Sequence, residues 1–399
     1  MNIIADISKN INAVCAEWAE ELKLIFKDEG LLIFLILLPL TYPIIYSWIY
    51  NNEIVREVPV AVVDNSHSRT SLCLINKFDA SPDVEVAYRC NDVDEARQLL
   101  GKQEIYGVIY IPEDFETRLN RMEQSTISIY ANMAFMLTYK AIFQTATAVT
   151  ANLNSEIQIS LSGNYTEREN EILTQPLKIE ETAIFNNTGG YGNFILPGVL
   201  VLIIQQVLLL GVGMNNGTRY ERLLNGNTDA RHEIQSGLSQ SVIGKTLCYF
   251  MLFALISTYV LLAVPKIFNF VQIPRIPQYI QFVIPYLLSC IFFAMTVSFF
   301  VRQRENVILI VVFTSIIFLF MSGMSWPQSN IPKFWEIFSY IFPSTFGIHA
   351  FIRINTMGAE YSDIATECRN LWIQAGVYFI TACLVYRDMR KKQTRAVKQ

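Results

Sequence analysis

The chain has 399 residues, of which 52% are hydrophobic and only 17% are charged, and its formal net charge is −4. A soluble domain usually carries about 25% charged residues, so this composition excludes a disordered chain, a coiled coil and a typical soluble enzyme. The small net charge gives no global basic surface of the kind that binds nucleic acid, and we expect no nucleic-acid partner.

The apolar residues gather into segments that are long enough to cross a bilayer. A membrane-spanning helix needs about 20 mainly apolar residues. Six spans are predicted, at 31–50, 191–214, 246–265, 280–301, 307–325 and 371–386. The last of them is short, but a dense basic tail follows it at 387–399. The mixed charges of the first 30 residues argue against a secretory signal peptide.

Residues 1–30 are predicted to form an amphipathic helix that lies along the membrane surface. Ile11, Val14, Trp18, Leu22 and Ile25 recur at spacings of three and four, with charged residues between them. A helix packed on another part of the protein has the same pattern. Because the segment directly precedes the first span, the surface position is favoured.

Basic residues in the loops set the expected orientation. The tail, the turn Arg302–Arg304 and the segment 215–245 lie on one side of a six-span chain and carry twelve Lys and Arg residues, against five in the other short loops. The chain is therefore expected in the plasma or inner membrane, with both termini and the 215–245 segment in the cytoplasm.

Residues 51–190 are hydrophilic, with twenty acidic and eleven basic residues. Strand patterns at Val58–Asp64, Val84–Tyr88 and Ile105–Ile111 alternate with helical stretches, which predicts a small α/β sheet followed by one long helix at 133–160. A span at 133–160 is the alternative, but it would turn the basic tail outward. The predicted fold class is an α-helical integral membrane protein with six transmembrane helices plus an inserted extracytoplasmic α/β domain.

No span has an Asp, Glu, Lys or Arg in its core, which argues against an ion-driven carrier. The nearest phosphate-loop pattern, from Gly237 to Thr246, has six residues between its glycines instead of four, so we expect no nucleotide site. The most polar positions within the spans are candidates for a transport path, although buried Gln pairs more often hold helices together. These are Gln205, Gln206, Thr296 and Thr314.

No catalytic or metal site is expected, because the three His residues lie far apart and no Cys-x-x-Cys spacing occurs. Cys73 and Cys90 share the outer domain, and in an oxidising compartment they would either form a disulfide or remain as two unpaired thiols. The sequence favours neither.

Two loops are longer than simple connectors need. The 215–245 segment offers exposed charges for docking a cytosolic partner, or it is merely solvated; its candidates are Glu221, Arg222, Arg231, His232 and Glu233. The 326–370 segment is rich in Pro and aromatic residues and too broken to span, which suits a hairpin of short helices at the outer surface. Such a hairpin is either a lid on an exit path or structural packing.

Several local patterns, in order along most of the chain, resemble the membrane subunit of the type-two ABC exporter family, in its branch with a long outer insert. The segment Gly217–Glu221 departs from E-x-G-T-x-x-x-L, the commonest motif of the family in this loop. The resembling stretches are Val58–Asp64, Asp79–Tyr88, Tyr106–Phe115, Asn193–Leu210, Gly244-Lys245 at the start of the third span, Ser322–Pro327, Ile331-Pro332 and Phe342–Ala359.

The resemblance implies a non-catalytic half-transporter that pairs with a second copy or a sister permease and with cytosolic ABC ATPase subunits. ATP would bind to those subunits, and this chain would hold no cofactor. Their closure would act on the N-terminal helix and the 215–245 loop, including Gly244 and Lys245, and would move an amphipathic drug, lipid or glycan outward through the lipid membrane. A periplasmic adaptor and an outer-membrane channel are further implied partners.

Two rival functions remain at this point. A membrane-anchored sensing protein would use the acidic outer domain to recognise a ligand, but anchoring alone explains poorly why five more spans follow. An enzyme acting on lipid head groups at the 326–370 hairpin would need an acid, base or metal set that the sequence does not offer.

Overall fold

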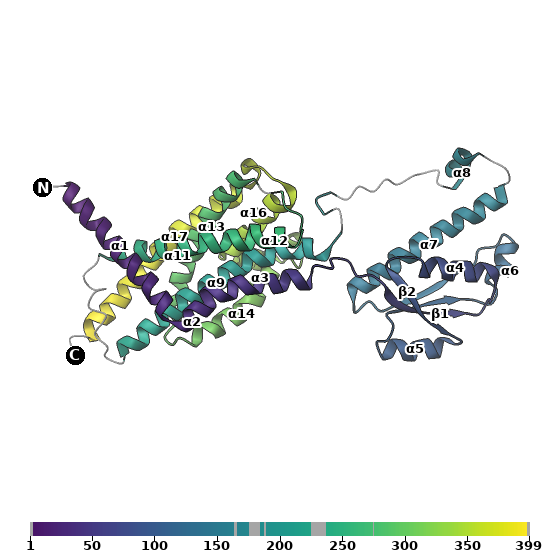
Figure 1. The fold of residues 1–399 in the computed structure, drawn as a ribbon, viewed down its shortest axis with the longest axis horizontal. Helices are drawn as coiled ribbons and strands as arrows, with labels where there is room; N and C mark the ends of the chain where they lie inside the picture. Colours follow the sequence, from purple (N-terminus) through teal and green to yellow (C-terminus); the bar gives the residue numbers. More distant parts are fainter. Residues whose placement is uncertain are drawn as a thin grey trace. The chain divides into compact units, whose positions relative to one another are not determined.

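The computed structural model describes residues 3–162, 166–174, 184–186, 189–224, 237–273 and 275–396 (Figure 1). The chain folds into two compact units, Met1–Glu53 with Ala183–Gln399, and Ile54–Thr182. The second unit is therefore inserted in the sequence between helices of the first.

The second unit is built on a four-stranded sheet with the strand order β2-β1-β3-β4. The central strand β1 is parallel to β2 and β3, and β4 runs antiparallel to β3. Its elements are β1 (Val58–Asp64), α4 (Arg69–Asp79), β2 (Val84–Cys90), α5 (Val93–Gly101), β3 (Gly107–Ile111), α6 (Phe115–Asn120), β4 (Ser128–Ala131), α7 (Met136–Ser162) and α8 (Glu167–Thr174).

Helices cover both faces of this sheet. Because successive side chains of a strand point to opposite faces, Val60 and Val62 of β1 pack against α4 and α7, whereas Ala61 and Val63 pack on the α5 side. This double burial is why β1 reads as a continuous apolar run instead of an alternating one.

The two cysteines of this unit are free thiols, so the disulfide that the sequence left open is not formed. Cys73 lies exposed on α4, while Cys90, at the end of β2, is buried in the core on the α5 face. The sheet stands between the two side chains.

Helix α7 (Met136–Ser162) covers most of the long helix expected at 133–160. One of its faces, including Ala141, Ile142, Ala146 and Leu153, is buried against the sheet. Helix α7 is not among the described helices that are long and apolar enough to cross a membrane.

The first unit is a bundle of long and short helices. In chain order they are α1 (Ile3–Lys27), α2 (Glu29–Leu32), α3 (Leu38–Ile49), α9 (Tyr191–Leu224), α11 (Leu238–Thr258), α12 (Val264–Ile267), α13 (Ile276–Val297), α14 (Asn306–Met321), α15 (Lys333–Ser339), α16 (Pro343–Met357) and α17 (Tyr361–Ala396). Single π-helical turns at Ile33–Leu37 and Tyr259–Ala263 join α2 to α3 and α11 to α12.

Within the described residues, five helical segments are long and apolar enough to cross a membrane: Glu29–Ile49, Tyr191–Arg222, Leu238–Ile267, Ile276–Phe300 and Tyr361–Met389. The pair α15 and α16, bent by 88°, makes a sixth if it counts as one broken span. It lies within the segment predicted to form a hairpin of short helices.

The predicted span at 307–325 is wrong in length. Helix α14 ends at Met321 after 16 residues, which is about 24 Å at 1.5 Å per residue and shorter than a bilayer core. Gly323 follows with φ of +77°, a conformation that ends the helix there.

Two other boundaries move outward. The predicted last span at 371–386 is the middle of α17, which begins ten residues earlier and takes in the end of the expected hairpin segment. The predicted loop 215–245 is mostly helical, because α9 continues to Leu224 and α11 already begins at Leu238. Charged residues appear where these helices continue beyond the apolar stretch, so hydropathy alone places the helix ends too early.

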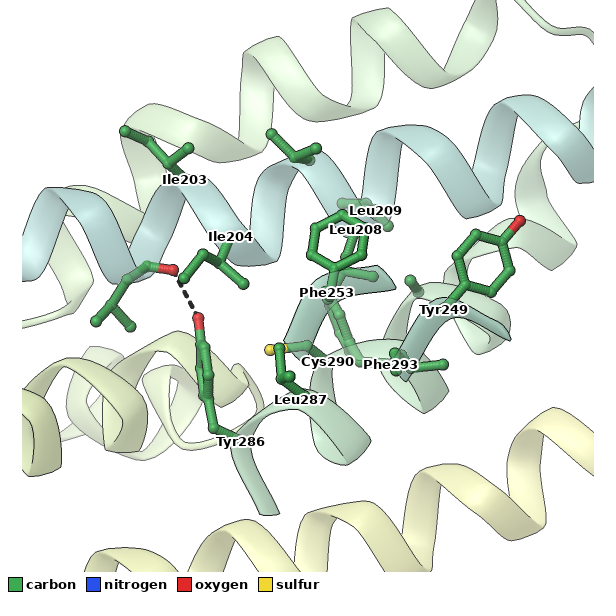
Figure 2. Packing of buried hydrophobic residues seen from close by; sticks show 14 of the residues in the cluster. Ile203, Ile204, Leu208, Leu209, Tyr249, Phe253, Tyr286, Leu287, Cys290 and Phe293 are labelled. Atoms are coloured by element: carbon green, nitrogen blue, oxygen red, sulfur yellow. Dashed lines mark hydrogen bonds between the residues drawn. The ribbon is translucent and has the colours of Figure 1, made fainter. Parts of the chain in front are cut away.

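Helix α9 is the centre of the bundle, and its middle is buried almost all round among α13, α14 and α16. Figure 2 shows Ile204 and Leu208 of this helix beside Phe253 of α11 and Leu287 of α13. The hydroxyl of Tyr286 donates to the carbonyl oxygen of Val201 at 2.7 Å, which satisfies a polar group in an otherwise apolar core.

Candidate functional site

Helix α1 packs along α11 at the end of the first unit where the C-terminal part of α17 also lies (Figure 1). The contact is close because residue 244 has no side chain. A Cβ atom at Gly244 would lie 2.7 Å from Cβ of Glu17 and 2.8 Å from the carbonyl oxygen of Val14. Glycine at this position therefore sets the separation of the two helices.

Glu21 of α1 is the hub of a buried polar network, with only 2% of its surface exposed. Its Oε1 accepts hydrogen bonds from Nδ2 of Asn215 at 2.6 Å and from the hydroxyl of Tyr249 at 2.9 Å. Its Oε2 forms an ion pair with the guanidinium of Arg219. One carboxylate thus ties α1 to both α9 and α11.

A second acidic residue of α1 repeats this arrangement one turn earlier. Glu17 is buried, and its Oε2 accepts a hydrogen bond from Oγ of Ser241 on α11 at 3.2 Å. Residues four apart lie on one helix face, so Glu17 and Glu21 both point into the apolar stripe that holds Trp18 and Ile25. We call Glu17, Glu21, Asn215, Arg219, Ser241 and Tyr249 the α1 joint.

The start of the first span is tied to the turn between α13 and α14. Both carboxylate oxygens of Asp28 accept hydrogen bonds from the guanidinium of Arg304, each at 2.7 Å. This bidentate pair holds the pKa of Asp28 below its usual value, helped by the backbone N–H groups of Leu31 and Gly30 and opposed by partial burial. The backbone N–H of Arg304 donates to Oε1 of Glu221 at 2.9 Å, which links the same turn to α9.

Lys245 of α11 is almost fully buried, and its ammonium lies 4.8 Å from the ring centre of Tyr386 on α17. The hydroxyl of Tyr386 in turn donates to Oδ1 of Asn216 at 3.2 Å, and Nδ2 of Asn216 donates to Oγ of Ser298 at 2.6 Å. This chain of contacts joins α11, α17, α9 and the turn after α13.

These contacts connect α1, α9, α11 and α17 to one another at this end of the bundle. Hydrogen bonds that a buried carboxylate accepts from several helices hold those helices in one arrangement more firmly than exposed pairs do. An open hollow of about 430 Å³ lies beside it, lined by Leu24, Lys27, Asp28, Glu29, Gly30, Arg222 and Arg304. A partner that moved α1 would therefore also move α9 and α11.

The structure brings together only some of the residues predicted to couple this chain to a partner. Glu221 is engaged within the chain by Arg304, Arg222 is exposed at the hollow, and Gly244 and Lys245 lie inside α11 and not in a loop. Arg231, His232 and Glu233 lie outside the described residues.

The four candidates for a transport path do not form one site. Gln205 accepts a hydrogen bond from the backbone N–H of Ser344 at 2.6 Å, and Thr296 lies 2.8 Å from the hydroxyl of Thr381 on α17. Thr314 donates to its own helix, to the carbonyl oxygen of Ile310. Gln206 differs: it is 8% exposed, and among the described residues neither of its amide atoms has a hydrogen-bond partner.

The sequence did not single out the α1 joint, although it held a signal. Glu17 and Glu21 fall within the stripe of Val14, Trp18, Leu22 and Ile25 and not opposite it. Acidic residues on the apolar face of an amphipathic helix need buried partners. Asn215 and Arg219 show the matching spacing of four at the end of an apolar span.

In the part of the chain that the structure describes, no group of three His, Cys, Asp or Glu side chains is placed to hold a metal ion. A search of the curated proteins finds no match. The family model described as ABC-2 family transporter protein matches residues 30–384, which is most of the sequence. The chain therefore belongs to the ABC-2 family of transporter proteins.

Proposed function

We propose that this chain is the permease subunit of an ATP-driven exporter, which moves an amphipathic drug, lipid or glycan out of the cytoplasm or the inner leaflet. A separate cytosolic ABC ATPase binds and hydrolyses the ATP, and this chain binds no cofactor. Membership of the family supports the assignment of this chain as a membrane transport component. The lack of charged residues in the cores of the spans supports the proposal that the energy source lies in another subunit.

The observation that carries the proposal is the α1 joint. Glu21 links α1, at one end of the bundle, to α9, its central helix, and to α11. The exposed face of α1 and the rim of the hollow, with Lys27 and Arg222, then form the surface on which the ATPase acts. Movement of the ATPase is passed through the joint to the spans.

This arrangement fits an orientation with both termini in the cytoplasm. The α1 joint, the turn around Arg304 and the basic end of α17 all belong to one end of the first unit, where positive charge favours the cytoplasmic side. Helix α3 runs away from that end and leads into the second unit, which we therefore place outside the cytoplasm.

Two copies of the chain, or this chain and a sister permease, complete the transporter. Gln206 is the best candidate for a residue of the transport path, because a buried amide that has no hydrogen-bond partner among the described residues is costly to keep for packing alone. In a cell with an outer membrane, the acidic second unit is the surface for a periplasmic adaptor and its outer-membrane channel. Crosslinking from this unit that recovers no periplasmic protein would count against that partner.

The test of the ATPase coupling is a pull-down of the intact chain from mild detergent, with ATPase activity as the readout. The charge reversals Lys27→Glu and Arg222→Glu act at the hollow. Lys266→Glu is the matched control, because Lys266 is also an exposed cation but lies at the other end of the bundle.

We expect the wild type and the control to retain a co-purifying ATPase and the two hollow variants to lose it. Retention in all variants would move the docking surface away from the hollow. If the wild type elutes as a single folded species without any ATPase, the exporter proposal fails, and a membrane-anchored sensing protein becomes the better explanation.

A further inference from the structure

The second unit carries an exposed apolar patch on the first two turns of α7 and the segment before it. Met136, at 71% exposed, is the most accessible of its side chains. The patch consists of Tyr130, Met133, Phe135, Met136, Leu137 and Phe143. Exposure of large apolar side chains to water is unfavourable, and a gathered group of them marks a contact surface.

The patch lies at one end of the sheet. Strands β1 and β3 begin there and β4 ends there, since Gly107 pairs with both Val60 and Ala131. The ring of Phe135 packs edge-on against Tyr106, the residue just before β3, with ring centres 5.5 Å apart. This is the end at which the chain enters the unit from α3.

The chain segment that carries the patch differs in charge from the rest of the unit. Residues 51–190 are acidic overall, yet no Asp or Glu occurs from Gln124 to Ser155, and the only charged side chain there is Lys140. Lys140 is exposed and lies on the same face of α7 as Met136 and Phe143. Apolar and aromatic side chains around a single cation are typical of a surface that meets lipid head groups.

The chain enters from a segment that has the features of a membrane boundary. The rings of Tyr42, Tyr46 and Tyr50 contact one another in turn at the end of α3, and the ring of Tyr50 also contacts that of Tyr191 at the start of α9. Aromatic residues of this kind gather where spans leave the hydrocarbon.

Glu53 follows Tyr50 closely in the chain and is held to the first unit by two hydrogen bonds from Nδ2 of Asn193, at 2.7 and 2.9 Å. Only Ile54–Glu57 then precede β1, and four extended residues reach about 14 Å. The tether is short enough to keep this end of the sheet within reach of the bilayer surface.

We propose that the apolar patch rests on the lipid bilayer, on the side of the membrane at which α3 ends. The first turns of α7 lie at the depth of the lipid head groups, and Lys140 binds their phosphates. Helix α7 does not cross the membrane, because its opposite face is buried against the sheet and its exposed face turns polar after Phe143, at Gln144 and Thr147.

The test uses the full chain in vesicles of phosphatidylcholine and phosphatidylglycerol. An environment-sensitive fluorophore is attached at Met136→Cys, after Cys15 and Cys73 are changed to Ser and Cys383 to Ala. The matched control is Met122→Cys, because Met122 is a similarly exposed methionine, at 77%, which follows α6 at the opposite end of the sheet. Quenchers are supplied either on the lipid chains or as iodide in the buffer.

We expect the lipid-borne quencher to act at least about threefold more strongly on residue 136 than on residue 122, as for a group that lies in the head-group region. Phe143→Asp in the labelled Met136→Cys chain should abolish this difference while the chain still elutes as a folded species. Equal quenching of both positions by iodide would overturn the proposal. Protection of residue 136 from both quenchers would also overturn it, since protein and not lipid would then cover the patch.

Discussion

Removal of the Glu21 carboxylate is predicted to destabilise the first unit more than any exposed substitution on α1. In Glu21→Ala, the buried amide of Asn215 and the hydroxyl of Tyr249 lose an acceptor, and Arg219 loses its ion-pair partner. Breaking one side of a buried ion pair costs about 3–5 kcal/mol. We expect a loss of this size in the free energy of unfolding, because Glu21 is 2% exposed and water cannot replace the missing acceptor.

The assay is denaturant unfolding of the purified chain in mixed micelles, with Lys23→Ala as the control for an exposed position on the same helix. The double variant Glu21→Leu with Arg219→Met removes both charges. It should recover at least about 2 kcal/mol, since an apolar pair of similar volume often replaces a buried ion pair without loss. If Glu21→Ala costs no more than Lys23→Ala, the joint contributes nothing to holding α1, and the proposed route of coupling fails.

Three further outcomes follow from single contacts. Gly244→Val forces α1 away from α11 and should cost about 1–3 kcal/mol, measured by the same unfolding assay and by faster protease cleavage of α1; unchanged cleavage would contradict the close approach. Asp28→Asn keeps the acceptor for the backbone N–H of Leu31 but removes the charge. Because the pKa of Asp28 is lowered by Arg304, its contribution is complete above the pKa of an unfolded Asp and lost as the pH falls through the lower folded value. The melting temperatures of wild type and variant should therefore differ by an amount equivalent to about 1 kcal/mol at pH 7. They should converge only as the pH falls below the usual pKa of Asp and through the lowered pKa of Asp28. Gln206→Leu should leave stability unchanged or higher, because it removes a buried amide without a partner, yet lower export of a dye in a reconstituted system; unchanged export would remove Gln206 from the path.

Apolar run length and strand pattern were enough to locate most elements of the fold. The buried run Val58–Asp64 is β1, and helix α7 covers most of the segment 133–160. Such features follow from local physics, since 20 apolar residues have few alternatives to a spanning helix and a strand buried on both faces must be apolar throughout.

Helix ends were harder to predict. Helix α9 continues through Arg219 and Arg222 because its backbone hydrogen bonds do not depend on hydropathy, so the apolar stretch is only part of the helix. Helix α14 stops early because Gly323 takes a left-handed conformation. Both outcomes depend on what surrounds the helix beyond the apolar segment.

By itself, the sequence determined that this chain is a membrane protein with an inserted sheet unit and no charged residues in the cores of its spans. Only the tertiary structure decided that Glu21, Asn215, Arg219 and Tyr249 meet. Glu21 and Tyr249 are 228 positions apart in the chain, and each residue of the joint on its own resembles a solvated charge or a helix-end polar group. Their role appears only when three helices pack together and exclude water, because burial is what turns an ordinary carboxylate into a fixed link between helices.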